Sequence, residues 1–168
     1  MATSCCPAWS MMAKKLFPEQ ADCISMALTP MTLTARLIKR HHKNAKVVFI
    51  GPCAAKKLEA MRTDIRSDVD FVLTFEEMDG IFDARHVEIE KMEEDPDGVN
   101  DASMDGRNFA VSGGVAKSVV DVIHQRFPDR EIKVANAEGL KDCRKLLTMA
   151  KAGKYNGYLL EGMACPGG

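Results

Sequence analysis

The sequence predicts an α/β fold of three layers, in which a mainly parallel sheet of about four strands is flanked by helices. Short apolar runs rich in β-branched and aromatic residues alternate with segments in which apolar residues recur at helical spacing. Such runs are typical of parallel strands that are buried on both faces. The length of 168 residues and the hydrophobic content of 46% suit one compact domain.

The predicted strands are bounded by glycine, proline or charged residues. The four runs are Lys46–Ile50, Val69–Thr74, Ile132–Ala135 and Tyr158–Leu160. Helices between strands allow the right-handed crossovers that connect parallel strands. The alternation of strand and helix therefore favours a layered α/β fold over an all-helical one.

Capping patterns mark the helices between these strands. Thr29 is expected to cap one helix, and Thr74 forms a capping box with Glu77 at the start of another. Two more helices are predicted over residues 115–127 and 140–150, which proline and glycine follow. In the helix after Thr29, the residues expected to point inward are Met31, Leu33, Leu37 and Ile38.

Composition excludes several classes of protein. The net charge of -1 argues against a nucleic-acid surface, which needs a basic patch. No apolar run is long enough to span a bilayer, and the N-terminus lacks the pattern of a signal peptide. Residues 88–106 are acidic and rich in turn formers, so we expect an exposed loop or insertion there.

Cysteine usage indicates reduced thiols. The chain has six cysteines, which are Cys5, Cys6, Cys23, Cys53, Cys143 and Cys165. A disulfide framework is one interpretation, but a domain of this size does not need covalent cross-links. The absence of a C-x-x-C pair argues against a zinc ribbon. We therefore favour reduced thiols, some of them metal ligands, and a cytoplasmic location.

Three of the cysteine motifs lie in turns rich in glycine or proline. Cys5 and Cys6 precede a helix expected to begin near Pro7, Cys53 follows the first predicted strand, and Cys165 follows the last. Sites in open α/β sheets form beyond the carboxyl ends of the strands. Cysteines in such turns are the usual ligands of iron–sulfur clusters. The competing interpretation is that these are buried apolar residues, as most free cysteines are.

These motifs resemble those of a known family. The segments TSCCPAW, PC-x-x-K-x-x-E and EGMAC are similar, in this order, to three motifs of the iron-only (FeFe) hydrogenase catalytic domain. The resemblance covers essentially the whole chain. It implies one α/β lobe, residues 1–168, of a larger catalytic domain whose N-terminal half would be its partner. It also implies an oxidoreductase that interconverts protons, electrons and H2, with an electron carrier such as ferredoxin.

The resemblance implies a cofactor and its ligands. The family's active site is a 4Fe–4S cluster bridged to a two-iron subcluster with CO and cyanide. Cys6, Cys53 and Cys165 match three of the four ligands of the 4Fe–4S cluster, and the fourth would lie just beyond Gly168. The isolated chain is therefore expected to be inactive, with the cofactor absent or incomplete.

The resemblance also assigns roles around the two-iron subcluster. Cys5 matches a thiol that relays protons, and Ser25 aligns with a serine on the same proton path. Lys56 matches a lysine whose ammonium contacts a cyanide ligand, by a charge-assisted hydrogen bond. Phe109 and Met163 align with residues that pack around the two irons.

Three positions depart from the family's pattern. Gly51 stands where methionine is usual, Met31 where active enzymes often have glutamine, and Ala110 where glycine is common. Residues around a metal site tune its potential and access. A divergent member is therefore expected, and two alternatives stay open. One is a hydrogen or redox sensor of the same family, and the other is a non-enzymatic, Narf-like protein of iron–sulfur assembly.

Overall fold

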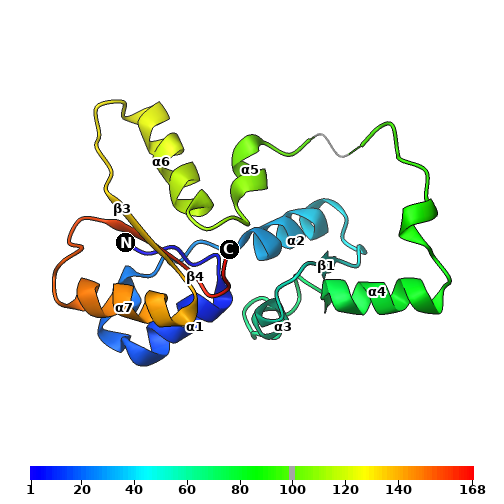
Figure 1. Cartoon of the computed structure of the whole chain (residues 1–168), viewed down its shortest axis with the longest axis horizontal. Helices are drawn as coiled ribbons and strands as arrows, with labels where there is room; N and C mark the ends of the chain where they lie inside the picture. The colour runs from blue at the N-terminus through cyan, green and yellow to red at the C-terminus, as the bar shows by residue number, and fades with distance from the viewer. Residues whose placement is uncertain (99–100) are drawn as a thin grey trace. The chain divides into compact units, whose positions relative to one another are not determined.

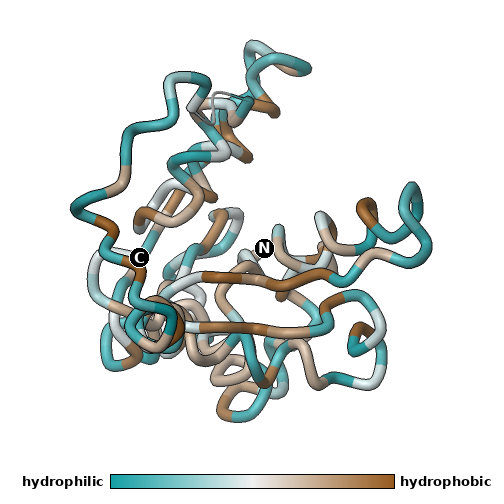
Figure 2. Tube along the Cα trace, turned by 90° about the vertical axis from the view of Figure 1, so that its right-hand side faces the viewer, coloured by the Kyte–Doolittle hydropathy of each residue, from teal (hydrophilic) through white to brown (hydrophobic). Residues whose placement is uncertain are grey.

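The computed structural model describes residues 1–98 and 101–168 (Figure 1). The chain divides into two compact units. The first unit contains Met1–Ala27 and Asp101–Gly168, and the second contains residues 28–100. Figure 2 shows that apolar residues gather in the regular elements, whereas the connecting loops are mostly polar.

The first unit is built on two parallel strands, β3 (Val134–Glu138) and β4 (Leu159–Met163). Its helices are α1 (Pro7–Leu16), the 3-10 helix η1 (Pro18–Cys23), α5 (Met104–Asn108), α6 (Gly114–Arg126) and α7 (Leu140–Lys151). Helices α1, α6 and α7 pack against these strands. The N-terminal segment is tied to the same sheet, because Ala2 bridges both Leu160 and Ile24.

The core of the first unit surrounds the single tryptophan. Trp9 is fully buried and packs with a cluster from α1, α7, β4, the N-terminal segment and the residues on either side of η1. The buried members of this cluster are Ala2, Trp9, Ala13, Phe17, Ile24, Cys143, Leu146, Leu147 and Leu160. Gly162 on β4 is required for this packing, since a Cβ there would lie 2.2 Å from the indole of Trp9.

The second unit is smaller and also holds two parallel strands, β1 (Val48–Ile50) and β2 (Phe71–Leu73). Its helices are α2 (Pro30–His41), α3 (Ala55–Ala60), α4 (Phe75–Ala84) and the 3-10 helix η2 (Ile89–Lys91). Met31, Ala35 and Val69 form its buried cluster, against which Phe49 and Val72 pack.

The structure confirms the fold class and corrects the sheet. All four strands of the described residues are parallel, but they form two sheets of two strands instead of one sheet of about four. Each pair is a strand–helix–strand unit: α3 lies between β1 and β2 in sequence, and α7 lies between β3 and β4. The strand predicted over Ile132–Ala135 instead starts at Val134 and ends at Glu138. It extends this far because β4 offers pairing partners as far as Met163, which pairs with Glu138.

The predicted helix starts are confirmed, but part of one buried face is wrong. Thr29 accepts a hydrogen bond from the Thr32 amide, and Thr74 and Glu77 form the expected capping box. On α2, however, the buried residues are Met31, Thr32 and Ala35. The residues Leu33, Leu37 and Ile38, which were expected to point inward, are all exposed. The second unit is too small to bury more than one narrow side of this helix.

Residues 88–106 include η2 and the first turn of α5. Their described side chains are exposed except for Asp105, which is half-buried. Residues 99–100 lie outside the described part of the chain. Within that described part, no helix combines the length and apolar character needed to cross a membrane.

Candidate functional site

The first cysteine turn begins helix α1. Cys6 is the N-cap residue, Pro7 is the first helical residue, and the Ser10 amide donates to the Cys6 carbonyl at 3.0 Å. The indole N–H of Trp9 donates to the Thr3 carbonyl at 3.0 Å. The turn is therefore fixed from both sides, by the helix and by the buried tryptophan.

The last cysteine turn meets the first one. β4 ends at Met163, and the amide of Ala164 donates to the Cys6 sulfur at 3.4 Å. Beyond it, the amide of Gly167 donates to a Glu138 carboxylate oxygen at 3.0 Å. The structure thus brings the Cys6 and Cys165 segments together within the first unit.

The middle cysteine lies in the second unit. Cys53 follows β1 and is half-buried, and its carbonyl accepts from the Lys56 amide at 3.2 Å as α3 begins. Its position just past the carboxyl end of a parallel strand is the one predicted.

Lys56 belongs to a buried polar cluster. Its ammonium lies 2.8 Å from Oε2 of Glu59, and Oε1 of Glu59 accepts from the hydroxyls of Thr29 at 2.6 Å and Thr32 at 3.2 Å. Glu59 is only 3% exposed and Lys56 only 8%. A buried carboxylate is tolerated when it is paired and hydrogen-bonded in this way. Thr29 and Thr32, at the N-terminus of α2, hold Glu59 in place, and Glu59 in turn fixes the direction of the Lys56 side chain.

The residues assigned to proton transfer and packing lie in the first unit. Cys5 is half-buried, and the Ser25 hydroxyl accepts from the Ala27 amide at 3.1 Å. Met163 is buried at the end of β4, and Phe109 is half-buried at the end of α5.

One buried carboxylate was missed in the sequence. Glu161 on β4 is fully buried, and its two oxygens accept from the amides of Gly113 at 2.7 Å and Ala116 at 2.6 Å. The signal available was the glycine turn ahead of α6, which predicts an anion site at a helix N-terminus. Sequence alone did not show that the anion would be a side chain of the EGMAC segment.

Cys143 is a buried packing residue of α7. Burial, together with the charge interaction with Cys6, raises the pKa of the Cys143 thiol to about 11. The thiol lies 3.4 Å from the carbonyl oxygens of Ala137 and Met163. At neutral pH this group therefore stays a thiol, and buried thiols of this kind are unreactive.

The donor chemistry of the first unit fits an iron–sulfur group. Thiolates are the ligands of such clusters, and amide hydrogen bonds to the sulfurs, like the one from Ala164 to Cys6, tune them. The hydroxyl of Thr3 is also buried without a hydrogen-bond partner among the described residues. Within residues 1–98 and 101–168, no group of three or more His, Cys, Asp or Glu is close enough to hold a metal ion by itself.

The fold and the cysteine turns define an α/β protein with thiols at the ends of parallel strands. A model of the family "iron only hydrogenase large subunit, C-terminal domain" matches residues 1–168. The chain belongs to this family.

Two curated relatives represent two kinds of protein. The periplasmic Fe hydrogenase large subunit of Nitratidesulfovibrio vulgaris is 28% identical over 209 residues, covering 99% of this chain and 49% of the relative. The nuclear prelamin A recognition factor of Xenopus laevis is 24% identical over 216 residues, covering all of this chain and 47% of the relative. The chain thus spans about half the length of these relatives. Both alignments are longer than the chain, so each relative carries residues in the matched region that this chain lacks.

Solved structures agree on the fold. A solved structure of an FeFe-hydrogenase, from work on its inactivation by oxygen, superposes with a TM-score of 0.75, at 24% identity, over 99% of this chain and 58% of that one. This likeness confirms the α/β fold with parallel strands.

Proposed function

We propose that this chain is the cysteine-bearing part of a FeFe-hydrogenase, an oxidoreductase that interconverts protons, electrons and H2. The observation that carries the proposal is the meeting of two cysteine turns, in which the Ala164 amide donates to the Cys6 sulfur. Because the chain spans about half of its relatives, activity would belong to a longer protein that includes the other half of the domain. The isolated chain would be inactive.

Cys6, Cys53 and Cys165 would hold a 4Fe–4S cluster bridged to a two-iron subcluster. When bound, this group would relay electrons and supply the iron needed for hydrogen chemistry. The chain's own contribution would be the three thiolates. Cys6 at the N-terminus of α1 is well placed for this, because a helix N-terminus favours negative charge.

Other side chains would move protons and hold ligands. Cys5 would carry a proton at its sulfur, with Ser25 as the next group on the path. Lys56 would donate from its ammonium to an anionic ligand, and Glu59 restricts the directions in which that ammonium can point. Phe109 and Met163 would exclude water by packing.

A sensor is the second candidate, and Gly51 favours it. A Cβ at Gly51 would lie 2.9 Å from the ring of Phe49, so a methionine does not fit there unless the ring moves. The surroundings of the two irons would therefore differ from those of the family's usual pattern. Hydrogen turnover by the full-length protein equal to that of a prototypical hydrogenase would rule out the sensor.

A protein of iron–sulfur assembly is the third candidate. The cytosolic iron–sulfur assembly component 3 of Rattus norvegicus matches the whole chain at 26% identity, close to the 28% of the hydrogenase relative. A non-hydrogenase of this kind would hold the 4Fe–4S cluster without the two-iron subcluster. The roles proposed for Cys5 and Lys56 would then not apply.

The test is an infrared spectrum of the full-length protein, produced anaerobically with the proteins that build the two-iron subcluster. Bands in the CO and cyanide stretching region are expected. A Cys5→Ser variant should keep the bands and lose hydrogen turnover, whereas Cys23→Ser, which changes an exposed cysteine of the same unit, should keep both. Cluster iron without these bands would contradict the hydrogenase proposal and favour the assembly protein.

A further inference from the structure

Glu161 is a charged residue in the centre of the first unit. It lies on β4, is fully buried, and is among the largest side chains that solvent does not reach. A buried carboxylate is strongly destabilising unless hydrogen bonds replace its water. Here both oxygens are satisfied, by the amides of Gly113 and Ala116 at 2.7 and 2.6 Å.

The two amides belong to the N-terminus of α6. Its N-cap, Gly113, has a left-handed backbone (φ 86°) and no side chain that could accept from the first turn. The first four amides of a helix have no partner within it, and they carry the positive end of the helix dipole. Glu161 supplies the missing acceptor from another element, so the anion site of this glycine turn is filled by the chain itself.

The same turn touches the segment that follows β4. The Ser112 amide donates to the Gly167 carbonyl at 3.1 Å. A Cβ at Gly168 would lie 2.0 Å from the Ala110 carbonyl oxygen, so the tail passes directly over the turn. Cys165 lies between the strand that Glu161 anchors and the tail that rests on residues 110–112.

We propose that Glu161 is a positioning residue for the cysteine turns. By binding the N-terminus of α6 with both oxygens, it fixes the end of β4 at the place where Ala164 meets Cys6 and where Cys165 is presented. Its importance for cluster binding rests on the proposed function, in which Cys6 and Cys165 are ligands. Its role as an anchor rests only on the contacts of the first unit.

The first test uses amide hydrogen exchange in the 168-residue chain. Glu161→Gln keeps the shape of the side chain but replaces one acceptor with an NH2 group that faces an amide donor. Loss of a charge-assisted hydrogen bond should speed the exchange of the Gly113 and Ala116 amides by about tenfold or more. Unchanged exchange at both amides in a folded variant would overturn the proposal.

The matched control is Glu138→Gln. Glu138 also accepts a backbone hydrogen bond in the first unit, from Gly167, but it lies at the surface. Exchange at Gly113 and Ala116 should stay as in the unchanged chain. Equal acceleration by both substitutions would mean that general loosening, and not the Glu161 anchor, controls these amides.

The unchanged chain gives an answer even if Glu161→Gln does not fold. The N-cap of α7 is Gly139, which also lacks a capping side chain. The Gly113 and Ala116 amides should therefore exchange at least about tenfold more slowly than the Leu140 and Lys141 amides of that first turn. Equal rates in the two helices would contradict the anchor.

The second test reads out the cysteines. In Glu161→Gln, alkylation of Cys6 should become severalfold faster, because the Ala164 amide no longer donates a hydrogen bond to the Cys6 sulfur. Alkylation of the exposed Cys23 serves as the internal standard. After anaerobic addition of iron and sulfide to the full-length protein, the variant should bind less cluster iron and show an altered electron paramagnetic resonance spectrum. Full iron content with an unchanged spectrum would overturn the positioning role. No cluster in the unsubstituted protein would contradict the proposed function instead, and hydrogen exchange would still decide the anchor.

Discussion

The two units hold their parts of the site by different means. In the first unit, a tryptophan-centred core and a fully buried Glu161 support the turns of Cys6 and Cys165. In the second, Cys53 precedes a short helix that carries Lys56, and Glu59 of this helix binds side chains instead of backbone amides. The buried cluster of the second unit has three members, whereas that of the first has nine. Stability in the first unit therefore comes mainly from packing, and in the second a larger share must come from polar contacts.

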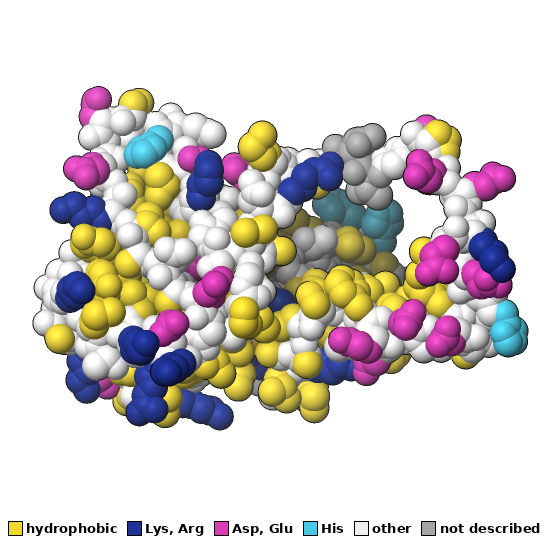
Figure 3. Space-filling view, viewed as in Figure 1, with side chains coloured by type: hydrophobic (Ala, Val, Ile, Leu, Met, Phe, Trp, Pro, Cys, Tyr) yellow, Lys and Arg dark blue, Asp and Glu magenta, His cyan; other side chains and the backbone are white. Residues whose placement is uncertain are grey.

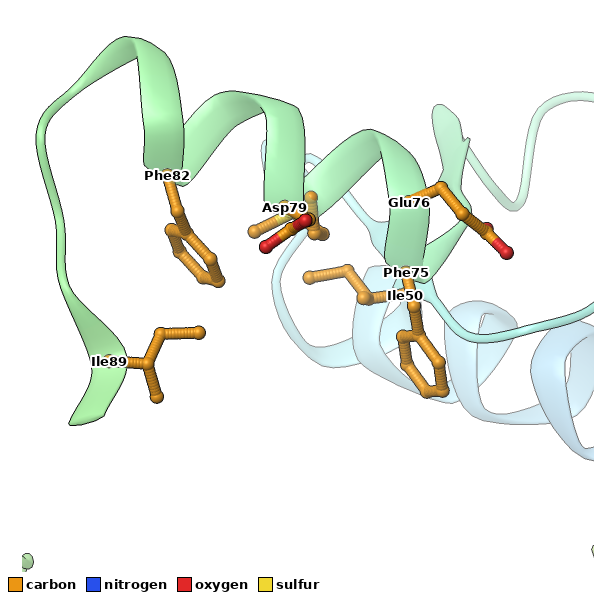
Figure 4. Close-up of a pocket in the computed structure, with 7 residues that line it drawn as sticks. Ile50, Phe75, Glu76, Asp79, Phe82 and Ile89 are labelled. Carbon is orange, nitrogen blue, oxygen red and sulfur yellow. The ribbon is translucent and has the colours of Figure 1, made fainter.

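The apolar surface of the second unit underlines this difference. One face of its sheet packs on α2, but Val48, Ile50 and Phe71 on the other face are 44–62% exposed. Ile50 lines a pocket of about 550 Å³ together with Phe75 and Phe82 of α4 and Ile89 of η2 (Figure 4). Figure 3 shows acidic side chains along α4 next to exposed apolar ones. Parallel sheets are normally covered on both faces.

The largest expected effect is in the core of the first unit. Trp9→Ala removes a fully buried indole and its hydrogen bond to Thr3. The free energy of unfolding of that unit should fall by about 3–5 kcal/mol. Phe71→Ala in the second unit removes an aromatic ring that is 62% exposed and should cost about 0.5 kcal/mol or less. Urea unfolding measures both. Similar losses for the two variants would break the contrast between the units.

The next effect is in the polar cluster of the second unit. Glu59→Gln leaves the Lys56 ammonium without its carboxylate, and breaking a buried ion pair costs about 3 kcal/mol. The double variant with Lys56→Met should recover part of this loss, since the buried ammonium is removed together with its carboxylate. A double-mutant cycle from urea unfolding gives the coupling energy. A coupling near zero would show that the two side chains do not stabilise each other.

A smaller effect is expected at the start of α4. Thr74 and Glu77 form a capping box, in which each side chain accepts from the backbone of the other residue. Thr74→Ala should lower the free energy of unfolding by about 1 kcal/mol, whereas Thr74→Ser keeps the hydroxyl and should restore most of it. If Ser and Ala destabilise equally, the cap is not the source of the effect.

The smallest effect should appear only in acid. Hydrogen bonds from Lys39, the Val47 amide and Lys46 hold the pKa of Asp70 well below its usual 3.8. A carboxyl with a lowered pKa in the folded state stabilises above its unfolded pKa, and this contribution is lost as the pH falls below about 4. The unfolding free energy of Asp70→Asn should therefore depend less on pH below that point. Parallel pH profiles for the two chains would exclude this role.

Local chemistry explains what the sequence could predict. The caps at Thr29 and Thr74 depend on neighbours three residues away, so they were predicted correctly. The exposure of Leu33 and Leu37 and the division into two sheets depend on how much surface each unit can cover, which no short pattern contains.

The candidate site, like the fold, could be predicted from the sequence only in part. Resemblance of short motifs placed Cys6 and Cys165 on turns that the structure joins. Glu161 was missed because its partners, Gly113 and Ala116, lie 45 or more residues away along the chain. A buried carboxylate and a glycine turn become one feature only when the fold brings them together.

The central claim is that Cys6, Cys53 and Cys165 are ligands of an iron–sulfur cluster. The most direct measurement is the iron and sulfide content of the full-length protein, prepared anaerobically with single alanine substitutions of Cys6, Cys53 and Cys165. Each substitution should lower the cluster content strongly, while Cys23→Ala should not change it. Full cluster content in Cys53→Ala would contradict the account, because Cys53 would then not be a ligand.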